Sequence, residues 1–192
     1  MMVRMHSSLL LSSALVAACL LAVCGCGTDP VTETSSPIRI NEVMSANDVY
    51  QDLVGDTDDW IELYNPTDQA FDLTGYFISD SANHRFKDAF QAGVTVPAGG
   101  VLLVWADAQP LQSSPRAPHL SFQLSSAGEG VWLSNPQGYL VDSLGFGLTP
   151  PNRVGTQWTS LQRFPDGNGS PRWCTEASPE ALNGAQCTGE QL

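Results

Sequence analysis

The chain has 192 residues, 20 of them acidic and eight Lys or Arg, which gives a formal net charge of −12 at pH 7. Proteins that bind a phosphate backbone present clustered Lys and Arg. This chain contains a single Lys, so we expect no nucleic-acid partner. An acidic exterior is also an ordinary way for a protein to stay soluble, so the charge alone identifies no ligand.

The first residues read as an export signal. Arg4 lies in a short polar start, and an apolar run follows from Leu9 to Val23. That run is too short for a membrane span of about 20 residues. A positive start before a short apolar core is typical of a secretory signal peptide. A buried N-terminal helix is the alternative.

The segment that follows, "LAVCGCGTDP", places small residues directly before a Cys. It resembles the lipobox of bacterial lipoproteins, and the best fit has Gly25 before the cut and Cys26 as the lipidated residue. Residues 1–25 would then be the signal peptide. Cys24 is the second choice, because the bulky Val23 would precede that cut. An unmodified periplasmic protein also remains open. A Cys with several acyl chains would anchor the protein stably, since each buried methylene contributes about 0.8 kcal/mol.

Residues 26–37 are rich in Thr, Ser and Pro and contain little apolar surface, so we interpret them as the lipidated Cys and a flexible tether. Residues 38–192 are a normal size for one domain. Gly27 follows Cys26, where an Asp would favour retention at an inner membrane. The expected location is therefore the cell envelope, at an outer membrane or the cell surface.

Two cysteines belong to the expected domain. Cys174 and Cys187 form an even pair in an oxidising compartment, which predicts a disulfide. It would close a tail rich in Pro, Gly and Asn and stabilise the protein by roughly 3 kcal/mol in the chain-entropy model.

The domain shows no long helical period. Short β-rich runs recur between turn signals instead, at residues 38–44, 59–65, 71–79, 94–106, 120–124, 130–135, 139–146 and 160–167. Seven or eight such strands predict an all-β sandwich of two antiparallel sheets. The run from Val101 to Trp105 is apolar on both faces, so we expect a central strand. In the second run, Ile61 and Leu63 should face the core and Trp60 and Glu62 the opposite side.

The motifs "INEVMSAN", "DWIELYNPTDQAFDLTGYFISD", "VPAGGVLLVWAD" and "RFPDGNGSPRW" follow one another from about residue 38 to residue 173. Together they resemble a bacterial lamin-tail domain. The resemblance implies an immunoglobulin-like fold and a non-enzymatic module for binding or targeting, with a protein or envelope surface as its partner. Exposed Trp132, Trp158 and Trp173 are candidate contacts, although we expect at least two of them to be core or strand-capping residues. A calcium-dependent adhesion or carbohydrate-binding module is an alternative function.

The chain carries none of the common catalytic motifs for metal hydrolysis, nucleophilic serine or phosphate binding. His84 and His119 are expected in exposed loops. Glu42 and Glu62 lie in the first two strands and form a candidate carboxylate pair for a minor hydrolase. A bulge near Asn41 would turn Glu42 away from the core. A structural role, with Glu42 or Asn41 bonding loop amides, is the preferred interpretation.

An acidic loop precedes the second strand. Asp56, Asp58 and Asp59 have the closely spaced oxygens that Ca²⁺ favours, because this ion takes six to eight oxygen ligands. The spacing is not that of an EF-hand. A solvated acidic turn is the alternative, and no other cofactor is expected.

Overall fold

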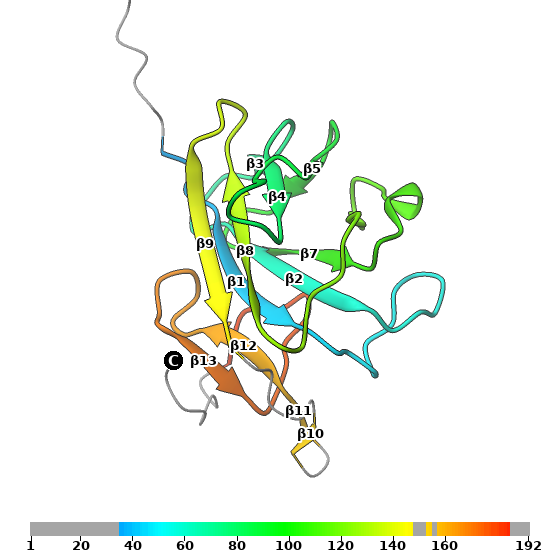
Figure 1. Ribbon diagram of the computed structural model, residues 1–192. Helices are drawn as coiled ribbons and strands as arrows, with labels where there is room; N and C mark the ends of the chain where they lie inside the picture. The colour runs from blue at the N-terminus through cyan, green and yellow to red at the C-terminus, as the bar shows by residue number, and fades with distance from the viewer. Residues whose placement is uncertain (1–34, 148–152, 155–156, 185–192) are drawn as a thin grey trace, which may run out of the picture. The chain divides into compact units, whose positions relative to one another are not determined.

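The computed structural model describes residues 35–147, 153–154 and 157–184 (Figure 1). All of them belong to the second of two units, which begins at Thr34. Regular structure in this part is β, apart from one 3₁₀ turn, η1 (Pro110–Gln112). No helix among the described residues has the length and hydrophobicity that a membrane crossing requires. The predicted signal peptide and Cys26 lie outside the described residues.

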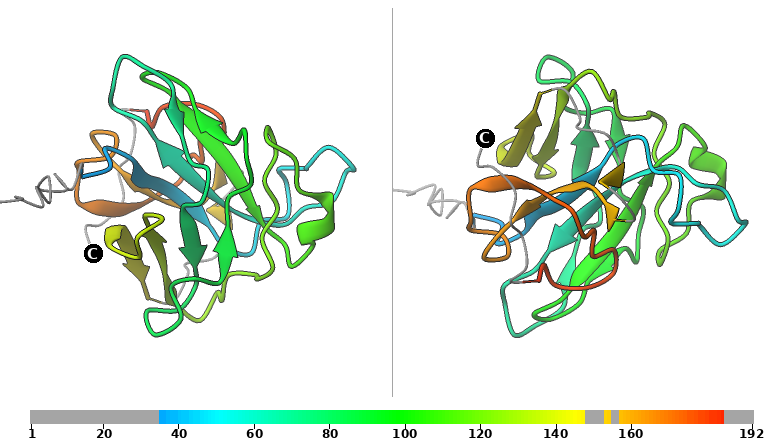
Figure 2. Two further views of the ribbon diagram at one scale, coloured as in Figure 1. Left: turned by 90° about the horizontal axis from the view of Figure 1, so that it is seen from above. Right: turned by 90° about the horizontal axis from the view of Figure 1, so that it is seen from below.

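Two main antiparallel sheets form the fold (Figures 1 and 2). The five-stranded sheet has the order β13-β12-β1-β2-β7, and the four-stranded sheet has the order β5-β4-β8-β9. Two ribbons, β3-β6 and β10-β11, complete it. The strands are β1 (Arg39–Met44), β2 (Asp59–Tyr64), β3 (Phe71–Asp72), β4 (Phe77–Ser79), β5 (Asp88–Ala89), β6 (Thr95–Val96), β7 (Val101–Ala106), β8 (Glu129–Ser134), β9 (Leu140–Phe146), β10 (Arg153–Val154), β11 (Gln157–Trp158), β12 (Ser160–Arg163) and β13 (Pro171–Cys174).

The core lies between these two sheets, and alternation along the strands fills it. Ile61 and Leu63 of β2 belong to the main cluster together with Val131 and Leu133 of β8. Trp60 points to the opposite side of the five-stranded sheet, as the sequence predicts, and packs there with Met44, Leu103 and Trp105. The predicted all-β, immunoglobulin-like sandwich is therefore confirmed. Its strands are more numerous and shorter than expected, because several are two-residue pairs.

Two expected strands are different in the structure. Residues 71–79 divide into β3 and β4, which join different sheets, because the chain turns at Gly75 with a φ of +77°. Residues 120–124 form no named strand, although Leu120, Phe122 and Leu124 enter the core as their alternation suggests. The Leu120 N–H donates to the Trp105 carbonyl of β7, but the Ser121 and Leu124 N–H groups donate to the carboxylates of Asp88 and Asp59, each at 2.9 Å, so no continuous ladder forms.

The expectation that β7 is central is wrong. It is the edge of the five-stranded sheet. Its apolar character on both faces has two causes. The inner residues Leu102 and Val104 meet the main core, while Leu103 and Trp105 join the cluster on the outer face. Segment 118–120 forms hydrogen bonds with the backbone of Trp105, so this part of the edge cannot pair with another strand.

The expected bulge in β1 is present. Ile40 pairs with Leu63 and Glu42 pairs with Glu62, so β1 has one extra residue, Asn41, at this point. Ile40 and Val43 can therefore both reach the core, and Glu42 lies on the outer face.

The outer face of the five-stranded sheet is covered by the C-terminal tail, defined here as residues 175–184 (Figure 2, right). The Ser178 N–H donates to Glu42 and the Glu180 N–H to Glu62. The Asn183 amide donates to the carbonyls of Asn41 and Arg163. Covering this face explains how Glu42, Glu62 and Gln162 can all be buried on the side away from the main core.

At the other end of the domain, the ordered fold begins earlier than the sequence suggested. Ser36 is buried, and its hydroxyl accepts a hydrogen bond from the Ile38 N–H at 3.4 Å. The last residues assigned to the tether therefore belong to the sandwich.

Candidate functional site

The two carboxylates considered for catalysis are neighbours across β1 and β2, and both are 0% exposed. Glu42 accepts hydrogen bonds from the Ser160 hydroxyl at 2.5 Å, the Gln162 amide at 3.0 Å and the Ser178 N–H at 3.0 Å. The Ser178 hydroxyl donates to its second oxygen at 2.8 Å. The predicted structural role of Glu42 in bonding loop amides is confirmed.

Glu62 has fewer donors around it. It accepts from the Asn41 amide at 3.3 Å and from the Glu180 N–H at 2.9 Å. Burial, together with the negative charge of Glu42, raises the pKa of Glu62 to about 9. Burial also raises the pKa of Glu42, opposed by its hydrogen bonds to Ser160, Ser178 and Gln162. Burial therefore favours the protonated form of both carboxyls, and Glu62 has the fewer hydrogen bonds to oppose it.

This arrangement argues against the hydrolase alternative. A glycosidase pair flanks a substrate bond and must be reached by substrate and water. Here both carboxyls lie beneath the tail, and each accepts a backbone N–H from it. The pair fastens the tail to the sheet.

The residues proposed for calcium do not converge on one point. Asp59 points inward: one oxygen accepts the Ala46 N–H and the other accepts the Leu124 N–H. Asp56 is exposed at the loop surface, and Asp58 is half-buried. Asp59 therefore ties the loop to two other segments. A calcium ion at these residues stays a prediction.

A different group of side chains does converge. Single donor atoms of Asp52, Asp107 and His119 all lie within 4.8 Å of one another. Asp58 interacts electrostatically with all three, and burial together with the charges of Asp107, Asp56 and Asp52 raises its pKa, an effect that His119 opposes. We call Asp52, Asp58, Asp107 and His119 the Asp–His cluster. It joins the loop before β2 to the segment after β7, two loops that project side by side in Figures 1 and 2.

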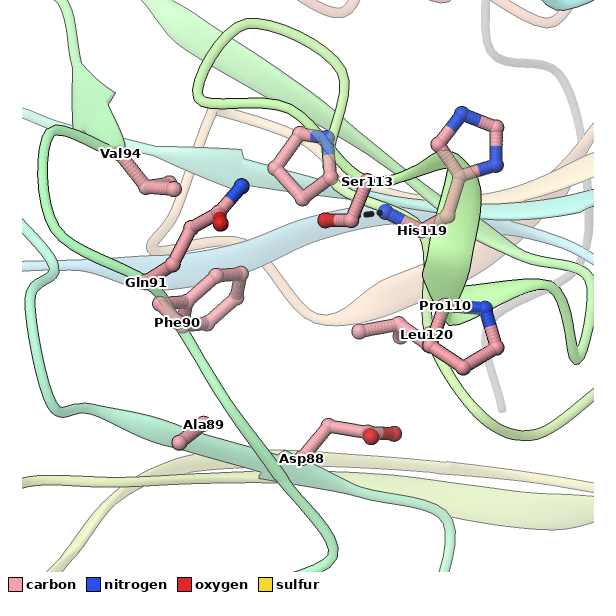
Figure 3. A pocket seen from close by; sticks show the side chains of 10 residues that line it. Asp88, Ala89, Phe90, Gln91, Val94, Pro110, Ser113, His119 and Leu120 are labelled. Carbon is pink, nitrogen blue, oxygen red and sulfur yellow. Dashed lines mark hydrogen bonds between the residues drawn. The ribbon is translucent and has the colours of Figure 1, made fainter.

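Several contacts hold His119 in place. Its Nδ1 lies 2.5 Å from Asp107 Oδ2, and the two side chains are 3% and 0% exposed. Its ring stacks on Trp105 with a centroid separation of 6.4 Å and an interplanar angle of 27°. Its backbone N–H donates to the Ser113 hydroxyl at 3.2 Å, beside a small pocket that Pro110 also lines (Figure 3).

The exposed position expected for His119 is therefore wrong, whereas His84 does lie exposed. The sequence offered one weak signal for this cluster: Asp107 directly follows an apolar strand. Nothing in the spacing of 12 residues between Asp107 and His119 indicates that the intervening loop folds back. Trp132 and Trp173 are half-buried, and Trp173 packs against the main core. The side chain of Trp158 lies outside the described set.

The model of the Lamin Tail Domain family matches residues 32–147, more than half of the chain. The chain belongs to the lamin tail domain family. A comparison with curated proteins found no match.

The matched region contains the Asp–His cluster but not the groups that surround Glu42. The four members of the Asp–His cluster lie inside the matched region of this lamin tail domain. Ser160, Gln162 and the tail, which supply most of the donors around Glu42, lie beyond it. Cys174 ends β13 and is buried, but Cys187 lies outside the described residues, so their disulfide stays a prediction.

Proposed function

We propose that this chain is a non-enzymatic binding module of the cell envelope, in which Cys26 carries the lipid anchor and the lamin tail domain presents a surface to a protein partner. One observation carries the non-enzymatic part. The carboxylate pair best placed by sequence for acid–base chemistry is buried and bonded to the tail. Membership of an immunoglobulin-like structural family supports the same assignment.

The proposed contact surface lies on the two loops that the Asp–His cluster joins. Leu53 is 88% exposed, Val54 is 66% exposed, and Leu111 of η1 is fully exposed. Large aliphatic side chains presented on loop tips are costly to hydrate and favour a protein partner. Asp48 and Asp56 are exposed in the same loop as Leu53 and Val54, so the complementary surface should be basic.

The anchoring part is tested by fractionating cells that express the full chain. The wild-type chain should remain with the membranes, and Cys26→Ala should release it into the soluble fraction. Cys24→Ala is the matched control, and it should stay membrane-bound. Release by Cys24→Ala alone would move the lipidation site to Cys24, and equal membrane retention of all three would contradict lipid anchoring.

The binding part is tested in the native envelope by crosslinking to a photoreactive residue placed at position 53 or 111. A specific crosslinked protein should form at these positions and be lost in Leu53→Asp/Leu111→Asp chains. A probe at Leu182, which is exposed at the tail, is the control and should not yield this product. Identical crosslinks from all three positions would contradict the proposed surface.

A further inference from the structure

We propose that the Asp–His cluster binds one divalent transition-metal ion, with Zn²⁺ as the best fit. This inference does not depend on the proposed function. It begins with two oxygens that have no hydrogen-bond partner among the described residues although they are buried: Oδ2 of Asp52 and Oδ2 of Asp58. Buried polar atoms are nearly always satisfied, so two such carboxylate oxygens in one cluster point to a bound ligand.

Backbone hydrogen bonds hold the carboxylate of Asp52 in place, so that its Oδ2 is available as a metal ligand. Oδ1 of Asp52 accepts three backbone N–H groups, from Val54, Gly55 and Asp56, at 2.8–2.9 Å. The loop therefore wraps around Oδ1 and leaves Oδ2 without a hydrogen-bond partner, in a carboxylate that has an oxygen within 4.8 Å of donor atoms of Asp107 and His119. Asp107 is held on both oxygens, because Oδ1 accepts the Gln109 N–H at 2.9 Å and Oδ2 lies 2.5 Å from His119 Nδ1, so an ion would bind His119 through Nε2 or replace that contact. Donors held this firmly lose little freedom when an ion binds.

The charge of the cluster also calls for a cation. Three carboxylates meet one imidazole, and in the described part of the chain the Lys and Arg ion pairs go elsewhere, from Lys87 to Asp80 and from Arg163 to Asp142. Carboxylates that share a poorly hydrated site repel one another unless a positive charge lies between them.

The donor set selects the class of metal. Calcium and magnesium take oxygen ligands, whereas an imidazole with carboxylates suits Zn²⁺ and related ions. Zinc donors lie about 2.0–2.2 Å from the ion, so neighbouring donors of a tetrahedral site are about 3.4 Å apart. The observed limit of 4.8 Å therefore requires the donor atoms to approach one another by up to about 1.4 Å when the ion binds. Asp52, Asp107 and His119 supply three ligands, and Asp58, which interacts electrostatically with all three, is the candidate for the fourth that zinc prefers.

A bound ion would clamp the loop before β2 to the segment after β7. Without it, the loop is tied down mainly through Asn47 and Asp59 near its ends. Metal binding would therefore fix the relative positions of the tips that carry Leu53 and Leu111.

The test uses the full chain purified in detergent and stripped with EDTA. Titration calorimetry with ZnCl₂ should give one site per chain, and His119→Gln and Asp52→Asn should each weaken the affinity at least tenfold. His84→Gln and Asp56→Asn are the matched controls, since they change the same residue types at exposed positions, and they should bind as wild type. Loading with Co²⁺ should give visible absorption bands that disappear in Asp52→Asn.

Three results would overturn the proposal: no zinc binding by the wild-type chain, equal loss of binding in the matched controls, or zinc binding unchanged by both cluster substitutions. Calcium binding that is lost in Asp56→Asn and kept in His119→Gln would also overturn it and would place an ion at Asp56, Asp58 and Asp59 instead. Circular dichroism identifies a variant that fails to fold. If His119→Gln fails, Asp52→Asn and the Co²⁺ spectrum decide.

Discussion

The buried carboxyl of Glu62 contributes a pH dependence to the stability of this protein. In the unfolded chain its pKa is near the ordinary value of 4.5, whereas in the folded protein burial and the Glu42 charge raise it to about 9. Between these two values the folded state keeps a proton that the unfolded chain releases. The free energy of unfolding from this group is therefore highest below pH 4.5 and falls as the pH rises toward 9.

We predict that Glu62→Gln removes the contribution of this carboxyl to the pH dependence. The wild-type protein should melt at a lower temperature at pH 8.5 than at pH 6, with a contribution from Glu62 of up to about 1.4 kcal/mol per pH unit. The amide cannot ionise, so the variant should be more stable than wild type at pH 8.5. Glu180→Gln, an exposed neighbour, is the control for calorimetric melting. An unchanged slope in Glu62→Gln would show that another group holds the proton.

Some residue positions could be predicted from the sequence and one could not. The faces of Ile61, Leu63 and Trp60 followed from alternation, because a strand places successive side chains on opposite sides. The bulge at Asn41 followed because a regular strand would have pointed Glu42 into an aliphatic core. His119 did not follow. Its burial depends on a loop folding back onto Trp105, and no local periodicity encodes that contact.

Among the elements, the turn between β8 and β9 depends on a glycine. The sequence "NPQG" predicted a turn, and the Gly138 N–H does donate to the Asn135 carbonyl at 2.9 Å. Gly138 has a φ of +86°, and a Cβ added there would lie 2.7 Å from Cζ of Phe86. Glycine is needed here for two reasons, backbone conformation and the close approach of a ring.

These two reasons can be separated by substitution. Gly138→Ala should lower the free energy of unfolding by more than Gly55→Ala, which has a φ of +95° but no atom within 4 Å of the added Cβ. The backbone cost common to both is about 1 kcal/mol. Combining Gly138→Ala with Phe86→Ala should remove the excess in a double-mutant cycle measured by urea unfolding. Equal losses in the two glycine variants would mean that Phe86 moves aside freely.

Some strands were missed or misplaced in the prediction from sequence, for physical reasons. Strands with two residues, such as β5, carry no periodic signal, and they exist because longer neighbours hold them in register. The apolar run of β7 was wrongly expected to be central, because burial by a covering tail and burial by neighbouring strands leave the same pattern in the sequence.

For the whole molecule, the fold extends beyond the part that the family match recognises. Strands β12 and β13 and the tail lie after residue 147. Without them β1 would become an open edge, and Glu42, Met44 and Trp60 would lose their cover. The sandwich fold and the family could be predicted from the sequence, because several short motifs occur together in the order typical of a lamin tail domain. The tail over the sheet was not, since its contacts are set by tertiary packing.

We predict that a chain spanning residues 32–147 will not unfold cooperatively, because an exposed apolar edge favours association. A chain spanning residues 34–192 should unfold in a single transition, and it serves as the control. Urea unfolding followed by tryptophan fluorescence and gel filtration measures both. A monomeric, cooperative 32–147 chain would contradict the requirement for the later strands.

The place of β12 beside β1 also determines when this protein can fold. Glu42 and Gln162 are neighbours in the five-stranded sheet but are 120 positions apart in sequence. Such a contact must be made against the entropy of closing a very long loop, and folds built on such contacts form in milliseconds to seconds. During synthesis, β12 can therefore pair with β1 only after the ribosome has made the chain across the 120 positions that separate Glu42 from Gln162.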